Sequence, residues 1–103
     1  MARDGDMAML LMRAIDADAR RAGCAVTLAR ATSTRWSSAT FAGARHELAI
    51  EGVDSPALDA WLAALPEAEL PVRAQLVADL VVKGVTREAG VATVAIEALT
   101  VGL

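Results

Sequence analysis

Apolar residues at the start of the chain recur with the spacing of a helix. Over residues 7–21 they follow the i, i+3, i+4, i+7, i+8 pattern of a single stripe, at Met7, Leu10, Leu11, Ala14 and Ile15. Asp6 is a suitable N-cap, because its carboxylate can accept from the free N–H groups of the first turn. Arg20 and Arg21 suit the negative end of the helix dipole, and Gly23 suits the left-handed residue beyond it. The pattern predicts a helix over residues 7–21.

The period then changes from that of a helix to that of a strand. Val26 and Leu28 alternate with smaller or polar neighbours, which predicts a strand over residues 24–33. The polar segment 33–38 has no periodicity, and we expect it to form a hairpin loop. Residues 40–51 alternate again, with one face made of Ala42, Ala44, His46, Leu48 and Ile50. Their neighbours on the other face include Arg45, Glu47 and Glu51, as in a half-buried antiparallel strand.

A second unit of the same kind follows. Ser55 and Pro56 form a helix start, with a capping hydroxyl and then proline at the first helical position. The apolar face of this helix consists of Leu58, Trp61, Leu62 and Leu65, and Pro66 ends it. After an acidic link over residues 67–71, alternation predicts a strand at 72–83. A polar turn is expected at 84–90, and a last strand rich in Val, Ile and Thr at 91–101.

The order of elements predicts the architecture. Two helices and four strands with one apolar face each favour an α+β two-layer sandwich, in which a four-stranded antiparallel sheet carries both helices on one face. This is a permuted ferredoxin-like order, αββαββ, in a single domain over residues 1–103 with a pseudo-repeat of 7–51 and 55–101. The first and third strands are then expected at the edges of the sheet.

Composition narrows the classes of function. Hydrophobic residues make up 55% of the chain, far too many for a disordered protein. The net charge is −3 with no run of Lys or Arg, so we expect no nucleic-acid partner. The apolar stretch 7–12 is much shorter than a membrane span. A single cysteine forms no internal disulfide, and one Cys with one His cannot complete a usual zinc site.

Candidate chemistry is sparse. No nucleophile elbow, P-loop or dinucleotide glycine pattern occurs, and we expect no catalytic, cofactor or metal site. His46 shares a face with Leu48 and Ile50, which favours a histidine at the edge of the core over a catalytic base. Cys24 favours a buried structural thiol, although Arg20 and Arg21 could activate it.

Two features favour protein binding instead. Trp36 lies in the expected loop beside Arg35, where it either folds back on the domain or marks a contact surface. The third strand presents Val77 and Val81 on its expected outward side. An apolar strand at a sheet edge invites pairing with another chain. We therefore expect Val77, Val81, Trp36 and Arg35 to contact a partner protein.

Three segments resemble the periplasmic domain of the general secretion pathway protein M family. They are AIDADARRAGCAVTLARA (14–31), IEGVDSPALDAWLAALPE (50–67) with its Leu-x-x-Trp-Leu-x-x-Leu core, and GVATVAIEALTV (90–101). The resemblance, which extends to pilus-assembly proteins of the PilO type, implies a non-enzymatic component of the inner-membrane platform of type II secretion. It implies a homodimer, pairing with the similarly folded L-type subunit, and a periplasmic location through a membrane anchor that this sequence does not contain.

The residues leave two other functions open. One is a cytoplasmic ferredoxin-like module that regulates by binding a ligand at a subunit interface. The other is a small enzyme that uses His46 or Cys24, which predicts a concave pocket containing one of them beside a carboxylate or an arginine.

Overall fold

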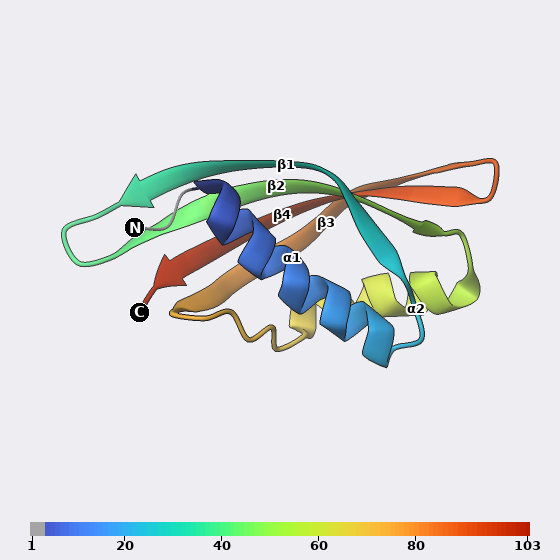
Figure 1. The fold of residues 1–103 in the computed structure, drawn as a ribbon, viewed down its shortest axis with the longest axis horizontal. Coiled ribbons are helices and arrows are strands. Elements are labelled where there is room, and N and C mark those ends of the chain that lie inside the picture. The colour runs from blue at the N-terminus through green and yellow to red at the C-terminus, as the bar shows by residue number, and fades with distance from the viewer. Residues whose placement is uncertain (1–3) are drawn as a thin grey trace.

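The computed structural model describes residues 4–103, and side chains from Met7 onward. Its elements follow the predicted αββαββ order (Figure 1). They are α1 (Asp4–Arg21), β1 (Val26–Ser37), β2 (Ala42–Val53), α2 (Pro56–Ala64), the 3-10 turn η1 (Leu65–Glu67), β3 (Gln75–Glu88) and β4 (Val91–Gly102).

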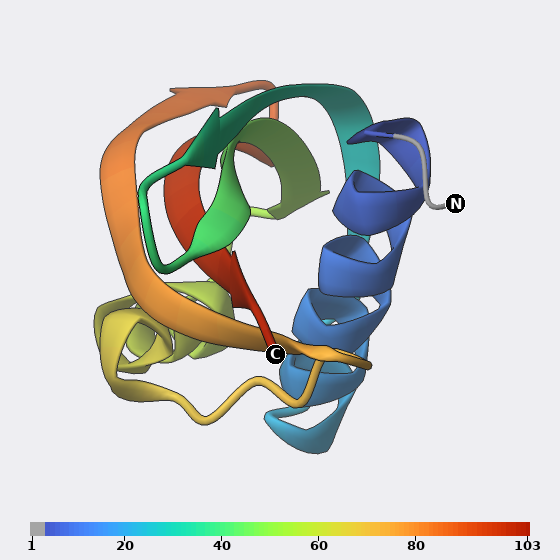
Figure 2. The same ribbon diagram turned by 90° about the vertical axis from the view of Figure 1, so that its left-hand side faces the viewer.

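All neighbouring strands of the sheet pair antiparallel, in the order β1-β2-β4-β3. This order places β1 and β3 at the edges and confirms the predicted α+β two-layer fold. The long strands twist strongly along the molecule, which measures 45 × 21 × 20 Å (Figure 2). Because β2 and β4 come from different halves of the pseudo-repeat, their pairing joins the two halves at the centre of the sheet.

Both helices pack on one face of the sheet, around a single hydrophobic cluster. The inward side chains of β2 include Leu48 and Ile50, as predicted from the alternation, and β4 adds Val94, Ile96 and Ala98. Leu11 and Ile15 of α1 and Leu58 and Trp61 of α2 complete the cluster. The other face of the sheet is left without a helix, and we call it the open face.

The helix boundaries follow the local signals at α2 more closely than at α1. Ser55 caps α2, since its Oγ accepts from the N–H of Leu58 at 3.1 Å, and Pro56 is the first helical residue, as predicted. The helix ends at Ala64, and η1 follows with Pro66 in its first turn. Helix α1 begins at Asp4, so the expected N-cap at Asp6 is wrong: this residue lies inside the helix, and its side chain falls outside the described part of the chain.

The first hairpin is longer than the pattern predicted. The expected loop at 33–38 is wrong, because β1 continues to Ser37 and places Arg35 and Trp36 within the strand. The turn lies beyond it, where the Ser38 N–H donates to the Phe41 carbonyl at 2.7 Å. Strand β2 is correspondingly shifted to Ala42–Val53 from the expected 40–51. An edge strand tolerates polar side chains on its solvent side, so polarity did not end this one.

The second hairpin is also displaced toward the C-terminus. Strand β3 runs over Gln75–Glu88 instead of 72–83, and Val72 makes only an isolated bridge to Gln75. The expected turn at 84–90 shrinks to Ala89 and Gly90, which have φ values of 52° and 79°. Positive φ at both central residues is the geometry of a two-residue type I′ hairpin, whose twist matches that of the strands.

Two bulges in β3 change which side chains face outward. The register shifts between Val77 and Asp79, and again between Val82 and Gly84. An extra residue reverses the alternation on one side of a bulge. Val77 therefore pairs with the buried Thr100 and packs against the core, whereas Val81 faces outward. The prediction that both valines share the outward side is wrong for Val77.

Candidate functional site: the open face of the sheet

The four residues expected to contact a partner do not form one surface. Trp36 and Val81 lie on the open face, by their pairing with Gly43 and Glu97. Val77 lies on the helix-covered side. Arg35 alternates with Trp36 and pairs with the buried Ala44, so it belongs to the helix-covered side as well, where it is exposed. The structure brings Trp36 and Val81 to one face and separates Val77 and Arg35 from it.

Trp36 folds onto its cross-strand partner Gly43. A Cβ added to Gly43 would lie 3.0 Å from Cζ2 of the indole ring, which shows how closely the ring covers the glycine. An aromatic ring often protects a strand glycine in this way. The indole Nε1 is buried without a hydrogen-bond partner among the described residues. Trp36 is thus half-buried, with part of its ring still on the open face.

Apolar side chains gather at the end of the open face near Trp36. Leu76 pairs with Val101 across β3 and β4, in the same row as Trp36 and Gly43. Leu76 is 55% exposed and Val81 43% exposed, while Leu99 and Val101 are half-buried. We call this set the apolar patch: Trp36, Leu76, Val81, Leu99 and Val101. Large apolar side chains clustered on one exposed face are typical of a protein interaction site.

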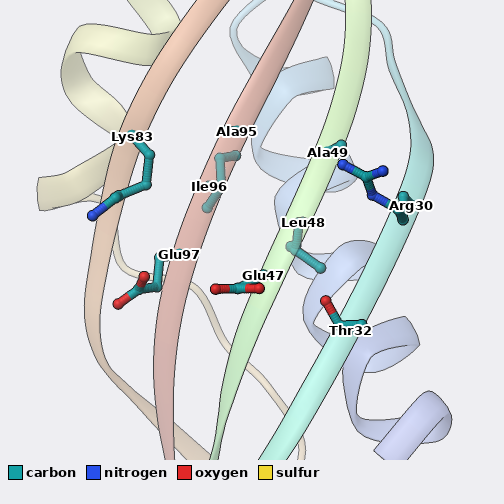
Figure 3. Close-up of a pocket in the computed structure, with 9 residues that line it drawn as sticks. All are labelled: Arg30, Thr32, Glu47, Leu48, Ala49, Lys83, Ala95, Ile96 and Glu97. Carbon is teal, nitrogen blue, oxygen red and sulfur yellow. The ribbon is translucent and has the colours of Figure 1, made fainter.

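The centre of the open face is a charged hollow of about 410 Å³ (Figure 3). Its floor is the directly paired Ala49 and Ala95 of β2 and β4. Arg30 of β1 and Lys83 of β3 stand at its sides. Glu47 and Glu97, also directly paired, close one end. Among the described residues, no ion pair joins either carboxylate to Arg30 or Lys83, which leaves four charges around an apolar floor.

The hollow was not predictable from the pattern of residues along the chain. The alternation of Glu47 and Ala49 on β2 was visible, but the facing Glu97 and Ala95 come from a strand far along the chain. Lys83 reaches the hollow from a bulge. Only the strand pairing brings these residues together.

His46 is part of a buried polar chain on the helix-covered side of the sheet. Its side chain is 0% exposed, Nδ1 lies 2.7 Å from the Ser33 Oγ, and Nε2 lies 3.0 Å from the Thr100 Oγ1. The Thr100 hydroxyl donates to the Ala44 carbonyl at 3.3 Å, so its oxygen is free to accept from Nε2–H. Nδ1 then accepts from Ser33. His46 lies deeper than the expected edge of the core, and it does not line the hollow on the open face.

Cys24 is half-buried at the start of the first hairpin and packs against the hydrophobic cluster. The cavity beside it is lined by Gly23, Cys24, Ala25, Val53, Ser55 and Leu58, without a carboxylate or an arginine. Among the described side chains, from Met7 onward, no group of three or more potential ligands is arranged to hold a metal ion. These sites do not supply the pocket that the enzyme alternative predicts.

Comparisons of the chain with protein-family models, curated proteins and solved structures found no match. None of the helices in the described part of the chain has the length and apolar character needed to cross a membrane.

Proposed function

We propose that this chain is a non-enzymatic protein-interaction domain that binds its partner through the open face of the sheet. The apolar patch carries this proposal. A sheet face without a helix normally presents polar side chains to water, whereas this one exposes Leu76 and Val81 beside three further large apolar residues. The neighbouring charges around the hollow would supply orientation and specificity at the edge of such a contact.

A finer proposal is that the domain belongs to the inner-membrane platform of a type II secretion or type IV pilus-like system. It rests on the resemblance of residues 14–31, 50–67 and 90–101 to the M family and on the αββαββ order. The domain would then work on the periplasmic side of the inner membrane and bind the similarly folded L-type subunit. The open face offers that subunit a second sheet face to stack on.

The experiment compares three lysine variants of β3 in binding to a purified L-type periplasmic domain. Leu76→Lys and Val81→Lys place a charge on the open face. Val85→Lys is the matched control, because Val85 is 37% exposed but pairs with the buried Val94, on the opposite face. We expect calorimetry to give unchanged affinity for Val85→Lys and a loss of about tenfold or more for the other two, since a lysine at an apolar contact must lose its hydration.

A wild-type chain that does not bind the L-type domain contradicts the secretion proposal. The broader proposal is then tested by NMR. Chemical shifts of the wild-type chain are compared before and after other candidate partners are added, and as the concentration of the chain itself is raised. Changes confined to outward residues of the four strands support it. Partner-induced changes confined to the helices contradict it.

A further inference from the structure

The open face has charges that are complementary to the same face of a second copy. Along β2 its outward residues run Arg45, Glu47, Ala49 and Glu51, so opposite charges lie at equal distances on either side of Leu48, at Arg45 and Glu51. Leu48 pairs directly with Ile96 of β4. Consider a two-fold axis that lies parallel to the open face and crosses the strands at right angles at the level of Leu48. It brings each residue of one copy opposite the residue of the other copy that lies equally far beyond this level. Arg45 of one copy then meets Glu51 of the other, and Glu47 meets Ala49.

The same operation fills the charged hollow. Glu97 of one copy comes to lie over Ala95 of the other, next to the place where Glu47 lies over Ala49. The two carboxylates of each copy would thus enter the alanine-floored hollow of its partner, between Arg30 and Lys83. The partner's Arg30 and Lys83 then offset the repulsion between Glu47 and Glu97, which stay paired as like charges on adjacent strands. This arrangement also satisfies the four charges that have no ion-pair partner within the described chain.

The size of the face fits this arrangement. Strands of 12 residues are about 40 Å long, and four strands span about 15 Å between the outer axes, so the face covers about 600 Å². Stable interfaces bury about 800 Å² of accessible surface on each partner. The two areas are of similar size, because side chains that project from the face make its accessible surface larger than its flat area. Twisted sheets stack within about 30° of each other, which keeps β2 and β4 superposed while the corners diverge.

We propose that a second copy of this chain docks face to face on the open sheet, related by this two-fold axis, with the Glu47 and Glu97 carboxylates of each copy in the hollow of the other. The proposal rests on the broader form of the proposed function and names a second copy as the partner, which excludes an L-type subunit from the same face while the copy is bound. The occupant is a second copy because the pattern is complementary to itself along β2, where positions 45 and 51 carry opposite charges at equal distances from the axis.

Charge exchange at positions 45 and 51 tests the proposal. Both side chains are exposed and lie about 20 Å apart on one strand, so they form no pair within one chain. Arg45→Glu and Glu51→Arg should each weaken self-association by about tenfold or more, since like charges then face each other across the interface. An equimolar mixture of the two variants should regain the wild-type affinity, because one chain then carries two acids and the other two bases. The double variant Arg45→Glu/Glu51→Arg should regain it as well.

Sedimentation velocity at low and high salt measures each association, and circular dichroism melts of dilute samples check that every variant folds. A wild-type chain that stays monomeric overturns this inference, as does a mixture no stronger than the single variants. If the wild type is monomeric but its binding to an L-type domain is lost in Val81→Lys and kept in Val85→Lys, the proposed function stands and only the second-copy inference fails.

Discussion

Gly43 is the residue at which the open face depends most directly on the absence of a side chain. A Cβ at this position would collide with the Thr100 carbonyl oxygen across the strand pair and press on the Trp36 ring. Gly84 offers a contrast on β3, since a Cβ there meets nothing within 4 Å. Neither glycine has the positive φ that would by itself demand glycine, so the difference between them is one of space.

We expect Gly43→Ala to lower the free energy of unfolding by roughly 2 kcal/mol or more, because the backbone of β2 or β4 must shift. Gly84→Ala should be neutral or stabilise by a few tenths to about 1 kcal/mol, through the reduced freedom of the unfolded chain. Urea denaturation of both variants measures the contrast. Equal effects of the two substitutions would contradict it.

His46 acts as a structural connection between β1, β2 and β4. Its ring joins Ser33 on one side to Thr100 on the other, and its side chain is fully buried on the helix-covered side of the sheet. A buried polar group of this kind stabilises the fold only while its partners remain, because each group left unpaired must still be desolvated.

His46→Ala should therefore destabilise the protein by roughly 2–5 kcal/mol, through both the cavity and the two partners left behind. Ser33→Ala removes one hydroxyl and should cost about 1 kcal/mol. Thr34→Ala, the exposed neighbour, should change stability by less than about 0.5 kcal/mol. Denaturation curves rank the three variants. A His46→Ala variant as stable as Thr34→Ala would contradict the structural role and reopen a chemical one.

At the scale of elements, the β3–β4 hairpin depends on its turn and on its contact with α2. Arg87, near the turn, hydrogen-bonds Asp59 at 2.8 Å and also Asp54, and these bonds raise its pKa above the usual value. The arginine therefore stays charged and holds the hairpin against the start of α2.

The turn itself carries a less favourable residue, because Ala89 has a φ of 52°. Alanine adopts this left-handed conformation at some cost, and asparagine does so more readily.

Ala89→Asn creates Asn-Gly, the preferred pair for a two-residue type I′ turn. We expect it to raise the free energy of unfolding by roughly 0.5–1 kcal/mol. Thermal unfolding followed by circular dichroism checks this. An unchanged or lower melting temperature would mean that the turn is not of this type.

At the scale of the whole molecule, the two halves of the pseudo-repeat share one core. Strand β2 of the first half pairs along its length with β4 of the second, and both helices contribute to a single hydrophobic cluster. The indole Nε1 of Trp61 in α2 also donates to Asp18 in α1 at 2.9 Å. Neither half can bury its apolar face without the other, so the halves should unfold together.

The two tryptophans report on this cooperativity, because Trp36 lies in the first half and Trp61 in the second. In Trp36→Phe the fluorescence of Trp61 should follow the same urea transition as the circular dichroism signal. In Trp61→Phe the fluorescence of Trp36 should do likewise. Each comparison is made within one variant, so any loss of stability caused by the substitution cancels. Two separate midpoints within either variant would show that the halves unfold independently.

The candidate site was only partly predictable. The sequence correctly indicated Trp36 and Val81 on the open face, because large apolar side chains in polar or edge surroundings are a local signal. It also selected Val77, which a bulge turns inward, and Arg35, which lies on the other side of its strand. The charged hollow was not predicted, since its residues come from four strands and its floor is a pair of alanines.

The sequence by itself determined the order of elements, the start of α2 at Ser55 and Pro56, and the inward face of β2. Each depends on neighbours within a few residues, through capping and the period of two or 3.6. The tertiary structure decided the ends of the hairpins, the bulges of β3 and the character of the open face. Those features depend on which strands pair and in what register. Cross-strand contacts, twist and burial together set the register, and they involve residues about half the chain apart.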